Sequence, residues 1–442
     1  MNNLRRHNIF ALNLDDFSPR ADVRLLYAPL AGVCSLATTD EIECLDKDVD
    51  AYPDCPSAEA LEPFMQGSPE QAKANAVATA DDFLQLYILP SFKCNFACSY
   101  CFSAMGRATE EIKPEQLLAV IDFFVDRRRI DSDFLSISYL GGGEPTLSWD
   151  IVRRGIERAD ELAKAQGIKI FHTIVTNGSR LTAEMVDFLR DHDVLIRVSF
   201  EILPDIQALQ RGQYERVAEG LRLAGERGAR HMVRSMITPD NVERLEEMIA
   251  TLRREFPAVK SVLFDPITSS DTFHDVDVTT RFYDNYIRHF LAARELSKTL
   301  GIDVACATLR NLDLIVDRYC AGEFCLTPDG ALTICHQVSS PREKDFADFV
   351  YGRVTADGHL DIDREKFLRL KSRYTVYDNP RCNDCDVRWT CGGGCTQQRR
   401  QYPDDILDIT CRAERRLTTA FLLERLADGA DIAQMIAHYD AD

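Results

Sequence analysis

The stretch Leu84-Gln-Leu-Tyr-Ile-Leu-Pro-Ser-Phe-Lys-Cys94-Asn-Phe-Ala-Cys98-Ser-Tyr-Cys101 runs from an apolar segment directly into three cysteines. Leu84–Leu89 predicts a buried strand, and the extended proline after it places the cysteines on the loop that follows the first strand of an α/β unit. Three thiolates at this spacing can bind one iron–sulfur cluster and leave one iron without a protein ligand. That open iron implies that a substrate or cofactor binds there.

A zinc site is the alternative explanation for the three cysteines. Zinc in proteins is usually held by four ligands in paired spacings such as C-x2-C. No fourth cysteine or histidine lies within twenty residues of the triplet. The spacing therefore favours an iron–sulfur cluster over zinc at this loop.

The composition narrows the class of protein. The chain has 442 residues, is 45% hydrophobic and carries a formal charge of −19. We expect no binding to nucleic acid or to a membrane, because an acidic surface repels phosphates and no apolar run is long enough for a span or a signal peptide. Fifteen cysteines without an export signal indicate a reducing compartment, so we expect a cytoplasmic protein.

The hydrophobic pattern divides the chain into three expected domains, at residues 1–80, 81–305 and 306–442. The middle domain alternates strands with amphipathic helices, which predicts an α/β fold: a partial (β/α)6 barrel of the TIM type. The expected strands are Leu84–Leu89, Leu135–Leu140, Ile168–Thr176, Leu195–Phe200, His231–Ile237 and Val259–Phe264. The expected helices include Pro114–Arg128, Trp149–Gln166, Ala183–Asp191 and Asn241–Glu255.

Ligands of such barrels collect at the carboxyl ends of the strands, where this sequence places glycine and polar residues. Gly141-Gly-Gly-Glu-Pro-Thr146 follows the second strand, about forty residues after the cysteine triplet. C-x3-C-x2-C and Gly-Gly-Glu-Pro together resemble the radical S-adenosylmethionine (SAM) superfamily, whose second motif binds the methionyl amine of SAM. The resemblance implies a [4Fe-4S] cluster on Cys94, Cys98 and Cys101, and SAM contacts from Gly142, Gly143, Glu144, Asn177, Ser199, Glu201 and Arg234.

Some of these positions also have purely structural explanations. Asn177-Gly178 is a common turn, and Arg234 can pair with a buried acid. Phe264-Asp-Pro266, at the end of the sixth strand, fits either the mouth of a substrate site or a turn.

A second cysteine-rich region begins at Cys320. Pro328-Asp-Gly330 predicts a hairpin turn whose returning strand ends at Cys335. The cysteines of this region are Cys320, Cys325, Cys335, Cys382, Cys385, Cys391, Cys395 and Cys411. Their spacing resembles the SPASM domain, the C-terminal extension of radical enzymes that modify peptides and proteins. A helix over Ala413–Ala427 is expected to follow.

By resemblance to sulfatase-maturing enzymes and peptide thioether synthases, a first auxiliary [4Fe-4S] cluster would use Cys320, Cys325, Cys335 and Cys395. A second would use Cys382, Cys385, Cys391 and Cys411, so that the chain holds three clusters. Cys395 crosses between the two cysteine runs, and spacing alone does not derive that assignment. Zinc in two four-cysteine sites is the alternative.

The N-terminal region predicts a small α+β unit. Val23–Leu30 and Gly32–Ala37 are expected strands, and a helix with its N-cap at Thr39 follows. This order loosely resembles the winged-helix peptide-recognition domain at the front of many peptide-modifying radical enzymes. An N-terminal extension packed on the core is the alternative, and residues 66–80 predict a linker or a weak surface helix.

The resemblance implies a radical SAM oxidoreductase that takes a hydrogen atom from a ribosomally made precursor peptide and installs a thioether, carbon–carbon or carbon–oxygen crosslink. It would need an external reductant such as flavodoxin or ferredoxin, and the sequence identifies no catalytic base. Oxidation of Cys or Ser to formylglycine is the alternative reaction, although sulfatase maturases usually have an Asp where this chain has His336. A non-catalytic electron carrier or peptide-binding scaffold is the alternative of another class, but it needs neither the open iron nor the glycine motif.

Overall fold

The computed structural model describes residues 2–18, 20–74 and 78–439. Its N-terminal unit is a three-stranded antiparallel sheet in the order β1-β2-β3. The elements of this unit are α1 (Asn2–Arg6), β1 (Phe10–Leu12), β2 (Val23–Ala28), β3 (Val33–Thr38), α2 (Thr39–Asp48), α3 (Ala58–Leu61) and α4 (Pro69–Ala74). The two predicted strands are confirmed, and β1 is an additional strand of three residues, too short to show an alternating pattern.

Strand β2 is buried on both faces of this sheet. Leu26 and Ala28 pack in a small core with residues of α1 and α2, whereas Leu25 and Tyr27 belong to the main core of the protein. Successive side chains of a strand point to opposite faces, so one strand serves two cores. The N-terminal sheet is therefore built into the rest of the molecule.

The N-cap of α2 lies one residue earlier than predicted. The Thr38 hydroxyl accepts a hydrogen bond from the backbone N–H of Glu41, and the Glu41 carboxylate accepts one from the backbone N–H of Thr38. This reciprocal capping box makes Thr38 the cap instead of Thr39.

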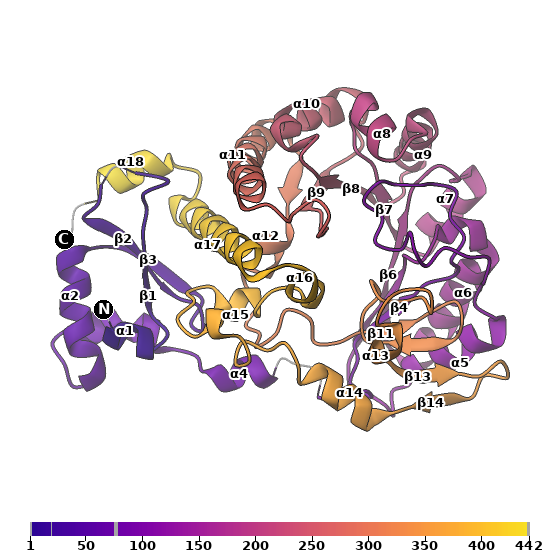
Figure 1. The fold of residues 1–442 in the computed structure, drawn as a ribbon, viewed down its shortest axis with the longest axis horizontal. Helices are drawn as coiled ribbons and strands as arrows, with labels where there is room; N and C mark the ends of the chain where they lie inside the picture. Colours follow the sequence, from indigo (N-terminus) through magenta and orange to yellow (C-terminus); the bar gives the residue numbers. More distant parts are fainter. Residues whose placement is uncertain (1, 19, 75–77, 440–442) are drawn as a thin grey trace.

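A parallel sheet forms the middle of the chain, with helices outside it (Figure 1). Its strands are β4 (Gln85–Ile88), β5 (Phe134–Tyr139), β6 (Lys169–Thr176), β7 (Leu195–Ser199), β8 (His231–Ile237), β9 (Ser261–Pro266) and β10 (Asp303–Ala305). Its helices are α5 (Pro114–Phe124), α6 (Trp149–Gln166), α7 (Ala183–Asp191), α8 (Pro204–Gln210), α9 (Tyr214–Glu226), α10 (Leu245–Glu255) and α11 (Val276–Leu300). The six predicted strands are present, and β10 extends the sheet by one more parallel strand beside β9.

The sheet continues into the cysteine-rich region. Strand β11 (Phe324–Leu326) pairs in parallel with β4, and β12 (Ala331–Thr333) returns antiparallel to it across the predicted hairpin turn. Strands β13 (Val350–Val354) and β14 (Leu360–Ile362) complete one sheet of 11 strands. The expected boundary between residues 305 and 306 therefore lies within a continuous sheet.

The C-terminal region is mainly helical after β14. Its helices are α12 (Ala307–Asn311), α13 (Phe346–Phe349), α14 (Arg364–Lys371), α15 (Arg388–Cys391), α16 (Thr396–Gln401), α17 (Asp404–Ala427) and α18 (Ile432–Ala437). Helix α17 begins earlier than the predicted residue 413, so that Cys411 lies on the helix. Figure 1 shows α17 between the N-terminal sheet and the helices around α11.

The N-terminal unit also contacts the cysteine-rich region directly. The side-chain oxygen of Asn8 accepts hydrogen bonds from Arg388 and, at 3.0 Å, from Nε1 of Trp389. Leu30 packs with Cys382 in a separate apolar cluster. The first eighty residues are thus held against the segment that carries four of the cysteines.

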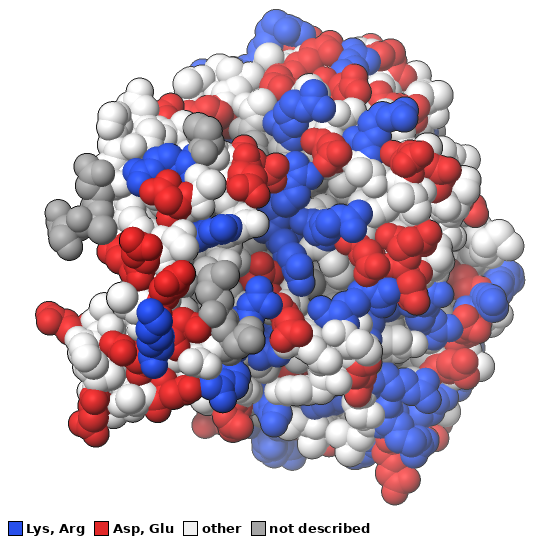
Figure 2. Space-filling model, turned by 60° about the vertical axis from the view of Figure 1, so that its left-hand side comes forward, with Lys and Arg blue, Asp and Glu red and all other residues white. Residues whose placement is uncertain are grey.

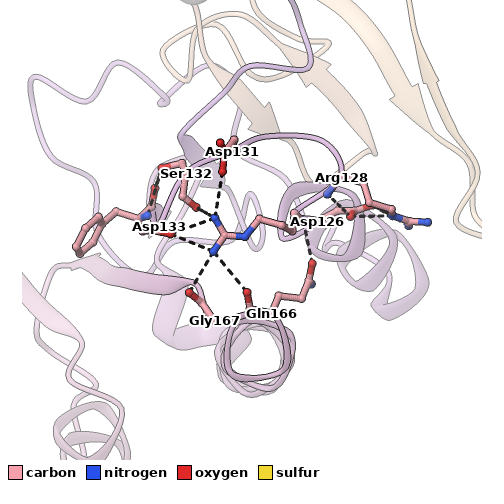
Figure 3. A network of polar contacts seen from close by, with 9 residues as sticks. Asp126, Arg128, Asp131, Ser132, Asp133, Gln166 and Gly167 are labelled. Atoms are coloured by element: carbon pink, nitrogen blue, oxygen red, sulfur yellow. Dashed lines mark hydrogen bonds and ion pairs between the residues drawn. The ribbon is translucent and has the colours of Figure 1, made fainter.

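The end of α5 is joined to its neighbours by Arg127, and Figure 3 labels its partners Ser132, Asp133 and Gly167. Arg127 donates to the carbonyl of Ser132 at 3.0 Å and to the carboxylate of Asp133 at 3.1 Å, just before β5. It also donates to the carbonyl of Gly167, at the end of α6, at 3.2 Å. One side chain therefore fixes the entry to β5 against α6.

Among the described residues, no helix is both long and apolar enough to cross a membrane.

Candidate functional site

A cavity of about 570 Å³ lies at the carboxyl ends of the parallel strands. Its wall includes residues of the cysteine triplet, the glycine motif and the C-terminal cysteines. The cysteines on it are Cys94, Cys98, Cys101, Cys306, Cys320, Cys335, Cys391, Cys395 and Cys411. One cavity therefore brings together the two cysteine-rich regions that the sequence separates by more than two hundred residues.

The three cysteines of the opening motif all line this cavity and are partly buried. Burial raises the pKa of the Cys94 and Cys98 thiols, while the guanidinium of Arg107 opposes that shift at both. Ionisation of Cys101 would also raise the pKa of each of these thiols. The three sulfur atoms therefore act on one another at one end of the cavity.

The glycine motif packs directly against the segment before Cys94. A Cβ atom at Gly143 would lie 1.9 Å from the carbonyl oxygen of Lys93, a distance that no side chain tolerates. That carbonyl accepts a hydrogen bond from the backbone N–H of Glu144 at 2.7 Å. Gly142 has a φ of +65°, in the left-handed region that favours glycine. The two motifs thus form one surface, and glycine is required for their close approach.

Glu144 lies at the centre of a hydrogen-bond network beside the cavity. One carboxylate oxygen accepts from the Thr146 hydroxyl at 2.7 Å and from the Thr176 hydroxyl at 2.6 Å, and the other accepts from the backbone of Asn177 at 2.7 Å. The side chain therefore joins the end of β5 to the end of β6. A carboxylate has about four acceptor positions, so the oxygen that faces Asn177 retains capacity for a further donor.

Asn177 and Ser199, which the sequence predicts to contact SAM, both line the cavity. The amide of Asn177 donates to the side-chain oxygen of Asn95 at 2.9 Å, which ties the end of β6 to the residue after Cys94. Ser199 ends β7 and lies opposite Arg234 in the neighbouring strand. The structure places both residues at the carboxyl edge of the sheet.

Arg234 lines the cavity and pairs with Asp265 at 3.2 Å, the acid partner that the sequence allowed. Its Nε atom is buried and has no hydrogen-bond partner among the described residues. Asp265 and Pro266 also line the cavity, in agreement with the substrate-mouth interpretation of that segment. Arg234 therefore combines a structural ion pair with unused donor capacity.

Glu201 has a different position from the one expected of a SAM contact. It is completely buried, and it is absent from the described residues that line the cavity. Its carboxylate accepts hydrogen bonds from Tyr100, from Ser235 at 2.5 Å and from the backbone of Met236 at 3.1 Å. In this structure Glu201 contacts the cysteine loop through Tyr100, on the side away from the cavity wall.

The eight C-terminal cysteines gather in two groups. In the first, ionisation of Cys320 or Cys395 would raise the pKa of Cys335, and ionisation of Cys335 would raise that of Cys325. In the second, ionisation of Cys382, Cys385 or Cys411 would raise the pKa of Cys391. The two ligand sets implied by the resemblance have the same members and stay predictions. Burial raises the pKa of the thiols, to about 12 for Cys320 and about 11 for Cys411.

His336 and Glu323 form a pair on the cavity wall that the sequence did not identify. Nδ1 of His336 lies 2.8 Å from one carboxylate oxygen of Glu323, and the backbone N–H of His336 donates to the other at 2.5 Å. The imidazole stacks on the ring of Tyr87, with ring centroids 5.5 Å apart. Glu323 lies thirteen residues from His336, and only the hairpin brings them together.

The donor set fits an iron–sulfur cluster and a cofactor that carries a carboxylate group. Thiolates are the ligands of iron–sulfur clusters, and three of them lie at one end of the cavity. The buried Nε atoms of Arg107 and Arg234, both on the wall, have no partner among the described residues and suit a carboxylate. Within those residues, no group of three or more Cys, His, Asp or Glu side chains could hold a single metal ion.

The charge near the cavity differs from that of the whole chain. On the face drawn in Figure 2, Lys and Arg side chains gather near the centre among scattered acidic groups. The cations on the cavity wall are Arg107, Arg211, Arg234, Lys371, Arg373 and Arg400. The acidic side chains on the same wall are Glu144, Asp265, Glu323, Asp348 and Glu414, so the wall is close to charge balance although the formal charge of the chain is −19.

Comparisons with known proteins agree with this architecture. Residues 88–252 match the family described as Radical SAM superfamily. A cysteine-type anaerobic sulfatase-maturating enzyme of Clostridium novyi (strain NT) is 20% identical over 361 residues, covering 75% of this chain and 93% of that protein. The structure of anSMEcpe with bound AdoMet and Kp18Cys peptide is 15% identical, with a TM-score of 0.63 over 78% of this chain and 99% of that one. SuiB of Streptococcus suis bound to the precursor peptide SuiA is 18% identical, with a TM-score of 0.51 over 83% and 85%.

Proposed function

We propose that this chain, a radical SAM enzyme by the domain at residues 88–252, is a maturase that installs an intramolecular crosslink in a ribosomally made precursor peptide. The observation that carries the proposal is the single cavity lined by both the three-cysteine motif and the C-terminal cysteines. A peptide segment in that cavity would lie between two redox sites. A plain electron carrier needs no such space.

The radical SAM domain implies a [4Fe-4S] cluster and SAM as cofactors. Cys94, Cys98 and Cys101 would hold the cluster, and Glu144, Asn177, Ser199 and Arg234 are the side chains on the cavity wall available to SAM. When bound, these cofactors would supply a one-electron cleavage of SAM, and the radical that this cleavage generates would remove a hydrogen atom from a substrate carbon. The protein's part is to orient the substrate and to exclude water.

Two auxiliary [4Fe-4S] clusters belong to the same proposal. The first would be held by the group of Cys320, Cys325, Cys335 and Cys395, and the second by Cys382, Cys385, Cys391 and Cys411. Oxidative coupling leaves one electron to be removed from the peptide, and an auxiliary cluster supplies an acceptor for it. The assignment is supported by the effect of neighbouring thiols on the pKa of Cys335 in the first group and of Cys391 in the second.

The N-terminal unit, residues 1–80, is proposed to dock the leader of the precursor. Leu30 and Asn8, in loops of this unit, contact the segment that carries Cys382. A leader bound there would be held beside the second cysteine group. The electrons for SAM cleavage would come from an external reductant such as flavodoxin or ferredoxin in a reducing cytoplasm.

Formylglycine formation is the second candidate reaction. The similarity to a sulfatase-maturating enzyme, which covers most of both chains, favours it. His336, where such maturases usually have an Asp, favours the crosslinking reaction. Here the position holds an imidazole that is hydrogen-bonded to the Glu323 carboxylate, in place of a carboxylate of its own.

The test is anaerobic reconstitution with iron and sulfide, followed by incubation with SAM, dithionite and the peptide encoded beside this gene. We expect 5′-deoxyadenosine and a product peptide that has lost two hydrogen atoms, with iron content matching three clusters. A product with an aldehyde in place of a thiol or hydroxyl would select formylglycine formation. Protein that binds zinc in place of iron, or that releases no nucleoside, would refute the proposal.

A further inference from the structure

A buried ionic network lies behind the loop that carries the three cysteines. Glu201, completely buried at the end of β7, accepts a hydrogen bond from the hydroxyl of Tyr100, the residue before Cys101. The same hydroxyl accepts a hydrogen bond from Nη1 of Arg211 at 2.8 Å. The Arg211 side chain is 8% exposed, and its guanidinium lies 3.8 Å from the Glu201 carboxylate. The network therefore joins α8 and β7 to the interior of the cysteine motif.

Arg211 contacts the cysteine loop on both sides of Cys98. Its guanidinium lies over the ring of Phe96, 5.8 Å from the centroid, and over the ring of Tyr100 at 6.0 Å. The adjacent carbonyl of Gln210 accepts a hydrogen bond from the backbone of Ser99 at 2.9 Å. The segment after α8 therefore fixes the loop between its second and third cysteines.

The network is polar in a definite direction. Among the charged groups, Arg211 contributes most to the environment of the Cys98 thiol and lowers its pKa against the effect of burial. Arg211 lines the cavity with Cys98, whereas Glu201 is absent from the described residues on that wall and accepts hydrogen bonds from Ser235 and the backbone of Met236. The positive end of the ion pair is thus directed at the cysteines and the negative end away from them.

A fixed cation beside an iron–sulfur cluster favours the reduced state, because reduction adds negative charge to the cluster. An arginine keeps its charge at every pH at which the protein folds. Burial strengthens the effect because little water screens it. Removing the charge should therefore make the cluster harder to reduce.

We propose that Arg211, Glu201 and Tyr100 form a positioning unit that holds the three-cysteine loop and sets the reduction potential of the cluster bound there. The unit acts through the cysteines and does not contact the substrate. The proposal rests on the radical SAM cluster and is independent of which peptide is modified.

The test is an anaerobic redox titration of the reconstituted protein, followed by electron paramagnetic resonance. In the proposed assignment only the three-cysteine cluster has an open iron, so the part of the signal that changes on adding SAM would report on it. In Arg211→Gln, we expect the ratio of reduced to oxidised cluster at a fixed ambient potential to fall tenfold, which is about 59 mV for a one-electron couple. Arg211→Lys keeps the charge and should retain most of the wild-type potential.

Glu201→Gln provides a test of sign. It keeps the side-chain shape and removes the negative end of the pair, so the potential should shift in the positive direction. Arg190→Gln is the matched control, because Arg190 is an arginine paired with carboxylates on the surface and should not change the signal. The iron content and the thermal midpoint of each apoprotein are measured in parallel.

A purely structural unit would lower the iron content and thermal midpoint while leaving the potential of the remaining clusters unchanged. That result would overturn the redox part of the proposal. Equal shifts in Arg211→Lys and Arg211→Gln, or a shift of the same sign in Glu201→Gln and Arg211→Gln, would also overturn it. No step depends on peptide turnover, so a wrong peptide assignment leaves the test intact.

Discussion

Replacing Gly143 with alanine tests the close packing of the glycine motif on the cysteine loop. The new Cβ would lie 1.9 Å from the carbonyl oxygen of Lys93 and 2.6 Å from its carbonyl carbon. Both are backbone atoms, so no side chain can rotate away. The loop must move, and the 2.7 Å hydrogen bond from the backbone of Glu144 to Lys93 is lost.

The expected cost combines two effects. Overpacking a tight site costs about 1–3 kcal/mol, and losing one buried backbone hydrogen bond costs about 1 kcal/mol. We therefore expect Gly143→Ala to lower the free energy of unfolding by about 2–4 kcal/mol. Movement of Glu144 should also weaken SAM binding, because its carboxylate joins the ends of β5 and β6.

Gly141→Ala is the matched control in the same loop. Its Cβ would meet only Leu89 and Phe102 side-chain atoms, at 3.8 Å or more, so the cost is that of a left-handed backbone, about 1 kcal/mol. Urea unfolding of the apoprotein measures stability, and chromatography of 5′-deoxyadenosine measures SAM cleavage. If the two variants matched in both measurements, the argument from close packing would be wrong.

Three further predictions follow from other parts of the molecule. Cys101→Ala removes one thiol of the three-cysteine group, so SAM cleavage should fall to background while the circular dichroism spectrum of the apoprotein is unchanged; retained nucleoside release would contradict the cluster assignment. Asn8→Gly preserves a positive-φ backbone but removes the acceptor of Arg388 and Trp389, so urea unfolding should show a loss of about 1–3 kcal/mol, and a loss below 0.5 would show that this contact does not hold the N-terminal unit. Asp160 has a lowered pKa, because hydrogen bonds from His172 and His192 outweigh the opposing effect of burial. Its contribution to stability is present above the unfolded pKa of about 3.9 and is lost as the pH falls through the folded value, so Asp160→Asn should destabilise the protein at pH 7 and flatten the acid side of its stability profile. An unchanged stability profile would show that the contacts of Asp160 with His172 and His192 do not contribute to stability.

Local signals in the sequence predicted most of the barrel. The alternation of apolar runs with amphipathic helices gave the bounds of β8, α6 and α7 as the structure has them. Strands of three residues, β1 and β10, carry too few positions for an alternating pattern, and they were missed. Helix α17 begins at Asp404, before its predicted start, and its first turns combine the acidic Asp404 and Asp405 with the buried Ile406, Leu407 and Ile409.

The sequence by itself predicted the superfamily and the cofactor class, since C-x3-C-x2-C and the glycine motif are local patterns of residues close in the chain, and the match of residues 88–252 to the Radical SAM superfamily confirms the prediction for that segment. Only the tertiary structure decided which distant residues share a site. It grouped Cys395 with the hairpin cysteines, paired His336 with Glu323, and placed Glu201 behind the cysteine loop. The physical reason is that a local motif shows only which ligands lie close together along the chain. The pairing of β11 with β4 and the packing of α17 on the barrel determine which distant residues lie close together in space.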